Sequence, residues 1–321
     1  MKSRFLATVA TVAFTAFAAI SMPISAAELP GPVNPLWHDG KIKNYLPYMT
    51  WSEVEALLKK SDMVIIPVGA MEQHGLGGPI GTDYLNGTQR ALLVAQQTDA
   101  LVVPILNVGQ SPYHLEFPGS IALSSETIQQ VYFEAAQSLI KQGFRRFMFL
   151  NSHAGNDAIT NFIVDRINQE TPAVAVELGE AASLMRPAGG GAAASNEPRV
   201  FDRHGGFNES SASLYLTPGL YDQSVARPAK ITYPPHLAAL VPKLLAGDRA
   251  AELVFLHEAL KSSATGKHTS TREMTDTGSW STVDPKTATA EAGRKSTEVF
   301  VNSAVAFINH WKELRPNGQK P

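Results

Sequence analysis

The chain has 321 residues, a formal net charge of −2 and no cysteine. The near-neutral charge and the absence of a basic patch argue against nucleic acid as a partner. Without cysteine the chain forms no disulfide bond, and any metal ion must be held by nitrogen and oxygen ligands.

The first 27 residues have the pattern of a secretory signal peptide. Lys2 and Arg4 precede an apolar, alanine-rich run over residues 5–20, and small residues allow cleavage near Ala27. The apolar run of about 16 residues is marginal for a membrane span, so we prefer export to an N-terminal anchor. The sequence therefore predicts an exported protein, periplasmic or extracellular, in which residues 28–321 form a single domain without a membrane contact.

Four short apolar segments are predicted strands. Met63–Val68 is a continuous apolar run, typical of a strand buried on both faces. Leu101–Val108 contains Pro104, which places this strand at an edge of the sheet. Phe147–Leu150 and Ala173–Leu178 are the third and fourth strands. Their alternation with helical segments indicates an α/β fold, a mostly parallel sheet with helices on both faces.

Helices are predicted between and after these strands. One follows Asp83, and a second runs over Glu126–Gln142, with Ser124 or Ser125 as its cap and Gly143 at its end. A C-terminal helix begins near Ala288. Its apolar side is expected to consist of Val299, Phe300, Ala304, Phe307, Ile308 and Trp311. Between these elements, Ala188–Ser195 is low in complexity and interpreted as a mobile loop, and Pro228–Pro242 is irregular.

Unusual polar residues follow the predicted strands. In chain order they are Glu72, His74, Asp83, His114, His153, His204 and Glu209. The carboxyl ends of parallel strands meet at one edge of a sheet, where α/β proteins bind ligands, so these side chains can converge. Each segment alone also fits an ordinary loop or strand end. Carboxylates and imidazoles at one edge, without thiolates, favour a site for Zn²⁺ or Mn²⁺.

Together these segments resemble the creatininase family, the creatinine amidohydrolases. The resemblance covers nearly the whole chain after the signal segment, in the same order. The segments that carry it are Pro67–Gly75 (Pro-Val-Gly-Ala-Met-Glu-Gln-His-Gly), Gly81–Asp83, His114 with Phe117–Ser120, Asn151–Asn156, His204–Ser211 and Val283–Gly293.

The resemblance implies a single three-layer α/β/α domain with two divalent ions, zinc and/or manganese, at the carboxyl edge of the sheet. Glu72 and His153 would hold one ion, His74 the other, and Asp83 would bridge them. It also implies a homo-oligomer, because related enzymes assemble in this way.

The chain departs from creatininase at one ligand. Creatininase has a glutamate two residues after the histidine of the third turn, and here that position is Gly155. Glu209 is the expected replacement. Because the surroundings of the second ion then differ, the departure argues against creatinine itself as the substrate.

The expected activity is hydrolysis of a non-peptide or cyclic amide C–N bond, such as that of a lactam, a formamide or a small modified peptide. A metal-activated water would attack the carbonyl, and His204 would stabilise the oxyanion or pass a proton to the leaving nitrogen. A role for His204 in orienting a ligand is the alternative. A non-catalytic exported protein that binds a small molecule is the competing function. Phosphoester hydrolysis ranks last because Arg203 is the only arginine or lysine in the segments that carry the candidate ligands.

Overall fold

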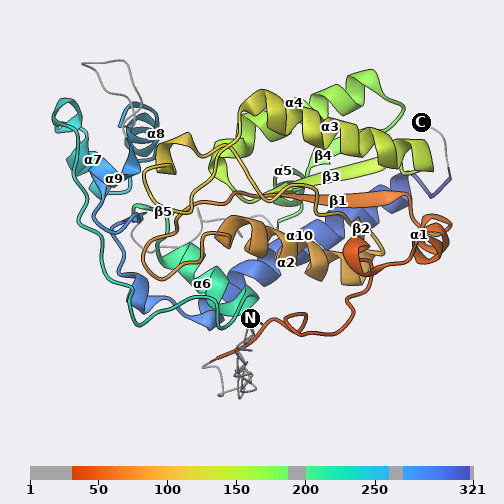
Figure 1. The fold of residues 1–321 in the computed structure, drawn as a ribbon, viewed down its shortest axis with the longest axis horizontal. Coiled ribbons are helices and arrows are strands. Elements are labelled where there is room, and N and C mark those ends of the chain that lie inside the picture. The colour runs from red at the N-terminus through yellow and green to blue at the C-terminus, as the bar shows by residue number, and fades with distance from the viewer. Residues whose placement is uncertain (1–30, 187–199, 260–269, 319–321) are drawn as a thin grey trace, which may run out of the picture.

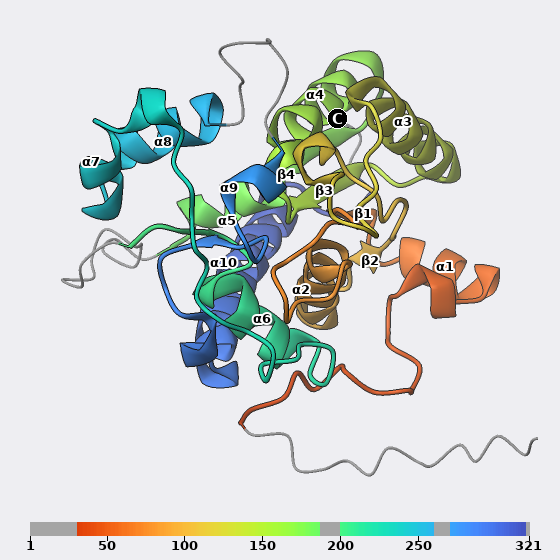
Figure 2. The same cartoon turned by 60° about the vertical axis from the view of Figure 1, so that its left-hand side comes forward.

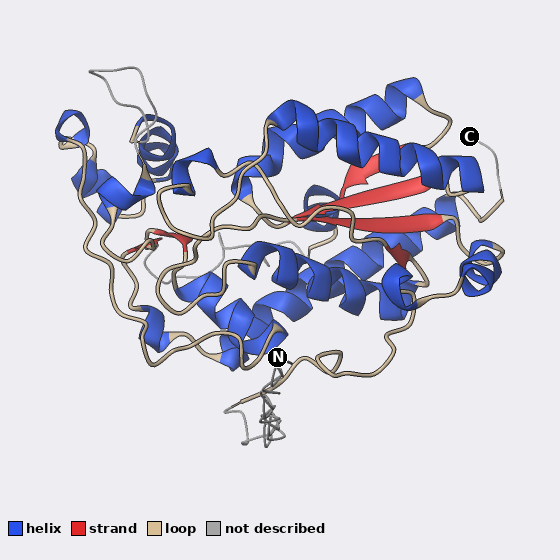
Figure 3. Ribbon diagram, viewed as in Figure 1, coloured by secondary structure: helices blue, strands red, loops and turns tan. Residues whose placement is uncertain are grey.

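The computed structural model describes residues 31–186, 200–259 and 270–318. Its centre is a parallel sheet with the strand order β2-β1-β3-β4. The strands are β1 (Met63–Val68), β2 (Leu101–Val102), β3 (Arg146–Asn151) and β4 (Val174–Glu177). Helices cover both faces, as Figures 1 and 3 show. The predicted three-layer α/β/α architecture and single domain are therefore confirmed.

The two faces of the sheet form two separate apolar cores. Val64 and Ile66 of β1 pack against α3 (Ser125–Gln142) and α4 (Asp157–Glu170), next to α1 (Trp51–Leu58). Ile65 between them points to the opposite face. That face is covered by α2 (Thr82–Thr98), α5 (Leu178–Leu184) and α10 (Ala290–Leu314). Successive strand residues point to opposite sides, so a strand buried on both faces must be apolar throughout.

Several predicted element ends are confirmed, one is wrong, and one residue of the C-terminal helix was predicted on the wrong side. The Ser124 hydroxyl caps α3 by accepting from Thr127 N, and Gly143 ends it with φ 119°. β2 stops at Val102 instead of Val108, although it does lie at the edge of the sheet. Val299 is 48% exposed and does not belong to the apolar side of α10, because it points about 100° around the helix from Phe300.

A smaller unit lies beyond the carboxyl ends of the sheet strands. β5 (Asp202–His204) and β6 (Trp280–Ser281) form an antiparallel pair, which packs with α7 (Val241–Leu245), α8 (Arg249–Glu258) and α9 (Thr271–Met274). Figure 2 shows these helices beside the sheet. α6 (Phe207–Leu216) follows β5 and packs along α10 and α2. The unit thereby brings the segment of residues 202–216 to the carboxyl edge.

The remaining described elements are short. Within the predicted irregular segment, residues 228–242, a 3-10 turn forms and α7 begins. The 3-10 helices are Leu46–Tyr48, Pro112–His114, Ala154–Asn156, Pro235–Leu237 and Pro285–Thr287. No helix in the described ranges is both long and apolar enough to span a bilayer. The predicted signal segment and the Ala188–Ser195 loop lie outside the described residues.

Candidate metal centre

The loop after β1 carries Glu72 and His74 back toward α2. Glu72 N donates to Ile80 O at 2.9 Å, and His74 pairs with Gly78, so the loop closes as a tight hairpin. The chain then enters α2, whose second residue is Asp83. The N-terminus of a helix stabilises a nearby carboxylate, here that of Asp83. The hairpin places this carboxylate against His74.

The turn after β3 presents His153. Its backbone N–H donates to the Asn151 side chain at 3.1 Å. Asn156 is buried, donates to Gly69 O at 3.0 Å and accepts from Gln110 N at 3.0 Å, which joins the loops that follow β1, β2 and β3. Both asparagines therefore stabilise the turn.

β5 and α6 supply the last two predicted residues. His204 ends β5, and Glu209 is the third residue of α6. Gly205 between them has φ 57°, and a Cβ there would lie 2.9 Å from the carbonyl carbon of His74. Glycine is needed at this close approach of two loops. Its N–H donates to Glu209 Oε2 at 2.6 Å and orients the carboxylate.

The five residues predicted to bind metal come together in two groups that share Asp83. In the first, His153 Nδ1 lies 3.2 Å from Glu72 Oε1 and 3.3 Å from Asp83 Oδ2. In the second, His74 Nε2 lies 3.0 Å from Asp83 Oδ1 and 3.7 Å from Glu209 Oε2. The donor atoms of each group lie within 4.8 Å of one another. The two oxygens of Asp83 therefore face different imidazoles.

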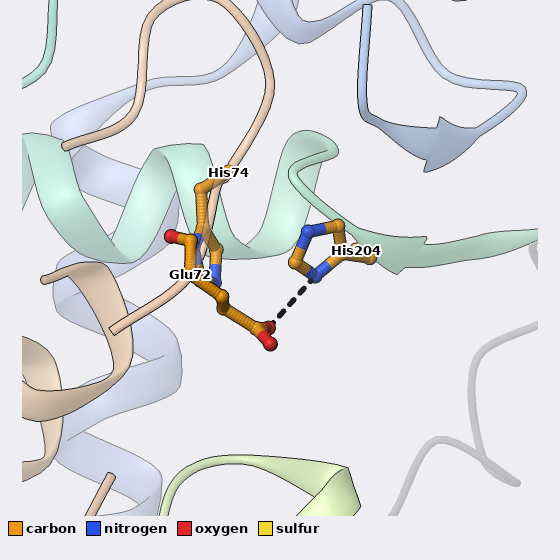
Figure 4. Close-up of side chains that lie close together, drawn as sticks. All are labelled: Glu72, His74 and His204. Atoms are coloured by element: carbon orange, nitrogen blue, oxygen red, sulfur yellow. Dashed lines mark hydrogen bonds and ion pairs between the residues drawn. The ribbon is translucent and has the colours of Figure 1, made fainter. Parts of the chain in front are cut away.

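His204 lies beside the first group. Its Nδ1 is 3.5 Å from Glu72 Oε1, and Figure 4 shows the ring pointing at that carboxylate across from His74. Glu72, His74 and His204 form a third set of possible metal ligands. The structure thus places the predicted catalytic histidine within reach of the same centre.

Backbone carbonyls fix which nitrogen of each imidazole faces the carboxylates. His74 Nδ1 lies 3.0 Å from Glu72 O, and His153 Nε2 lies 3.1 Å from Gln110 O. His204 Nε2 lies 2.6 Å from Gln73 O. A carbonyl only accepts, so each of these nitrogens carries the donated hydrogen, and the other nitrogen faces the centre, where it can bind a cation in place of a proton.

The carboxylates strongly perturb the imidazoles. Burial alone would lower the pKa of His74, but Asp83 and Glu209 raise that pKa to about 10. Burial also opposes the charge on His153, yet Glu72 and Asp83 raise its pKa well above the usual value. The pKa of Glu72 is lowered well below its usual value, against the effect of burial, by the charge of His153. The centre therefore holds positive charge tightly, whether as protons or as a cation.

The side chains present fit divalent cations. Glu72 Oε2 and Asp83 Oδ2 are buried without a hydrogen-bond partner in the part of the chain that the structure describes. Carboxylate oxygens in that position are costly unless a charge compensates them. Imidazole nitrogen and carboxylate oxygen are donors suited to zinc and manganese.

Gly155 has no room for a side chain. A Cβ there would lie 2.3 Å from His153 Nε2 and 2.5 Å from Gln110 O. A side chain does not fit here unless the Gln110 backbone or His153 shifts, and glycine itself offers no metal ligand. Glu209 reaches it from α6 instead and completes the group with His74 and Asp83.

Sequence reasoning assigned no role to Gln73 or to His114. Gln73 Nε2 lies 3.0 Å from both His114 Nδ1 and His204 Nε2. His114 Nε2 lies 3.6 Å from Glu72 Oε2. The available signals were the place of Gln73 between two ligands and the place of His114 after the second strand. Neither signal indicates which side chains Gln73 and His114 contact.

The fold and the donor set define a class, an α/β/α protein with a carboxylate and imidazole metal centre at the carboxyl edge of a parallel sheet. The chain belongs to the creatininase family, whose model, described as creatinine amidohydrolase, matches residues 47–308. Members of this family are metal-dependent amidohydrolases.

Individual relatives differ in the substrates that their names give. The chain is 29% identical over 137 residues to a 3-dehydro-scyllo-inosose hydrolase of Thermotoga maritima, covering 42% of this chain and 44% of that protein. It is 29% identical over 264 residues to a mycofactocin precursor peptide peptidase of Mycolicibacterium smegmatis, covering 79% and 87%. A solved creatininase variant of Zn-Zn type shares the fold, with a TM-score of 0.57, 22% identity and coverage of 85% and 98%.

Proposed function

We propose that this chain is an exported hydrolase that cleaves an amide C–N bond, other than an ordinary peptide bond, with water activated between two divalent cations. The observation that carries the proposal is the shared carboxylate, Asp83, whose oxygens lie 3.0 and 3.3 Å from two different imidazoles. A carboxylate that belongs to two donor groups at once suits a pair of cations. Membership of the creatininase family supports the reaction class.

Each cation would have three protein ligands. Glu72, Asp83 and His153 would hold one, and His74, Asp83 and Glu209 the other. The absence of cysteine favours zinc or manganese with oxygen and nitrogen donors, and the Zn-Zn creatininase supports zinc. When bound, such a pair lowers the pKa of a water and polarises a carbonyl.

His204 is proposed to move the proton. Its Nε2–H is committed to Gln73 O at 2.6 Å, which leaves the Nδ1 lone pair facing Glu72 Oε1 at 3.5 Å. Nδ1 can therefore accept a proton from the attacking water and deliver it to the leaving nitrogen.

The proposed substrate is a small amide such as a lactam or a formamide. The peptidase relative, which matches 79% of this chain, makes a short modified peptide the second candidate. Fold likeness does not decide between them. Phosphoesters remain disfavoured, because Arg203 pairs with Glu252 of α8 and is thereby engaged.

The test combines metal analysis with substrate screening. The purified protein should contain zinc or manganese and, with metal restored after chelation, hydrolyse at least one of creatinine, a lactam, a formamide and a modified peptide. Glu55→Gln, an exposed charge on α1, is the matched control and should leave metal content and activity unchanged. A fully loaded protein that binds one of these compounds without cleaving it would favour the non-catalytic binding protein. Export is checked by sequencing the N-terminus of the periplasmic protein, expected near Glu28.

A further inference from the structure

His114 is a buried imidazole to which the proposed mechanism gives no task. It ends the 3-10 turn Pro112–His114, and its ring stacks on that of His204 with centroids 4.5 Å apart and an interplanar angle of 22°. Its Nε2 lies 3.6 Å from Glu72 Oε2, a buried oxygen without a hydrogen-bond partner among the described residues. In each stacked ring, the nitrogen that carries the hydrogen decides whether the ring presents a donor or an acceptor to Glu72.

The amide of Gln73 is oriented by the backbone. Its Oε1 accepts from Gly75 N at 2.9 Å, and its Nε2 donates to Gly278 O at 2.9 Å. Reversing the amide would set the carbonyl oxygen against Gly278 O and the NH₂ group against Gly75 N–H, so the orientation is fixed. One hydrogen of Nε2 remains for the two imidazoles.

This remaining hydrogen determines the tautomer of His114. Nδ1 of His114 lies 3.0 Å from Gln73 Nε2 and 2.8 Å from Thr271 Oγ1. A planar amide N–H cannot turn away, whereas the Thr271 hydroxyl, which also lies 3.0 Å from Tyr113 O, can rotate its single hydrogen toward either acceptor. Nδ1 must therefore be bare, because a hydrogen on it would point at the amide hydrogen. The hydrogen of neutral His114 then sits on Nε2, toward Glu72.

His204 is fixed by the same residue through its backbone. His204 Nε2 lies 2.6 Å from Gln73 O, and only an N–H at that nitrogen makes so short a contact favourable. Nδ1 of His204 is then bare. The two stacked rings thus offer opposite groups to the two oxygens of Glu72, an N–H to Oε2 and a lone pair beside Oε1.

We propose that Gln73 is a positioning residue that sets the hydrogens of both rings, so that the Nε2–H of His114 faces Glu72 Oε2 at 3.6 Å while His204 keeps a free acceptor at Nδ1. The effect on metal binding rests on the proposed function, in which Glu72 is a metal ligand. An N–H that faces the outer oxygen of a ligating carboxylate favours the orientation in which the inner oxygen points at the cation. Partners of this kind typically change metal affinity by about 10–100-fold.

The hydrogens can be measured directly. Nitrogen NMR of the protein labelled with ¹⁵N-histidine distinguishes a bare imidazole nitrogen from a protonated one, and a His114→Gln spectrum assigns the signals. His114 and His204 should both carry hydrogen on Nε2. In Gln73→Met, His114 should shift toward the Nδ1–H form, with Thr271 as acceptor, while His204 keeps its form because a backbone carbonyl holds it. Hydrogen on Nδ1 of wild-type His114, or no change in Gln73→Met, would overturn the inference.

Metal binding supplies the second measurement and does not depend on Gln73 variants folding. His114→Gln can place an amide N–H where Nε2–H stood, whereas His114→Leu fills the space without a donor. Zinc affinity should fall about 10–100-fold in His114→Leu and remain close to wild type in His114→Gln. Equal losses in both variants would contradict the donor role.

The two proposals can fail separately. The tautomer of His114 is read in metal-free as well as zinc-loaded protein, so it tests Gln73 even if no amide is cleaved. If the protein binds no zinc or manganese, the proposed function fails while the tautomer result stands. If it hydrolyses amides with His114 protonated on Nδ1, only the inference about Gln73 fails.

Discussion

The two halves of the candidate metal centre differ in burial. Glu72 and His153 on one side are 1% and 7% exposed. Across the shared Asp83, the Glu209 side chain is 35% exposed. The first half is also surrounded by His114 and His204, whereas the Glu209 carboxylate is oriented by Gly205 N–H.

This difference suggests different tasks for the halves. A buried ligand with fixed neighbours has little freedom to relax, so the Glu72 half should retain its cation. The Glu209 half faces solvent through a partly exposed carboxylate, so we expect its cation to exchange first. We also expect substrate to enter on this side.

Removing the shared carboxylate should have the largest effect. Asp83→Asn keeps the size of the side chain but replaces one charged ligand oxygen with an amide nitrogen. Because Asp83 belongs to both donor groups, both cations and all activity should be lost, as measured by elemental analysis and amide hydrolysis. Circular dichroism controls for folding. A folded variant with a full metal complement would show that Asp83 is not a ligand of both cations.

Removing the open ligand should separate the halves. Glu209→Gln should weaken the affinity for one cation by more than the roughly 10–100-fold that is typical of residues contacting a ligand from outside. The Glu72 half should stay loaded. Zinc titration with a competing chelator measures both affinities. Glu72→Gln is the matched comparison and should weaken the other site. If both variants lost the same cation, the division into halves would be wrong.

A side chain at Gly155 should disturb the buried half by crowding His153. In Gly155→Ala the Cβ would lie 2.3 Å from His153 Nε2, so the imidazole must shift. Overpacking of this kind costs about 1–3 kcal/mol, measured by denaturant unfolding. Gly219→Ala, with no atom within 4 Å, controls for space, although its φ of 86° adds backbone strain. Unchanged stability in Gly155→Ala would contradict the crowding at His153.

A further expected effect is a pH dependence of the metal-free protein. The folded-state pKa of His74 is raised from 6.5 to about 10, so its protonation stabilises the fold fully below pH 6.5. That contribution is lost as pH rises toward 10. Zinc would take the place of the proton and remove this dependence. Thermal unfolding with chelator should therefore show a falling Tm over this interval, and zinc should raise Tm most at its alkaline end. A flat profile with chelator would argue against the raised pKa.

The sequence alone located most of the sheet and helices. Met63–Val68 is confirmed to the residue, because a strand with two buried faces must be apolar throughout. The predicted end of β2 was wrong. Pro104 removes a ladder hydrogen bond, and the edge strand has a partner on one side only. Val299 was misplaced because apolar residues can occupy an exposed helix position at little cost.

The candidate ligands were named from residue type and from their place after strands, reinforced by the family resemblance. Residue type and position after a strand can both be read directly from the sequence. The convergence of Asp83 between two imidazoles, the crowding at Gly155 and the pairing of Gln73 with two stacked rings are contacts between loops distant in the chain. Only the packing of those loops sets distances of a few ångströms. Hydrogen bonding and metal binding depend on such distances, so the tertiary structure alone decided which groups face one another.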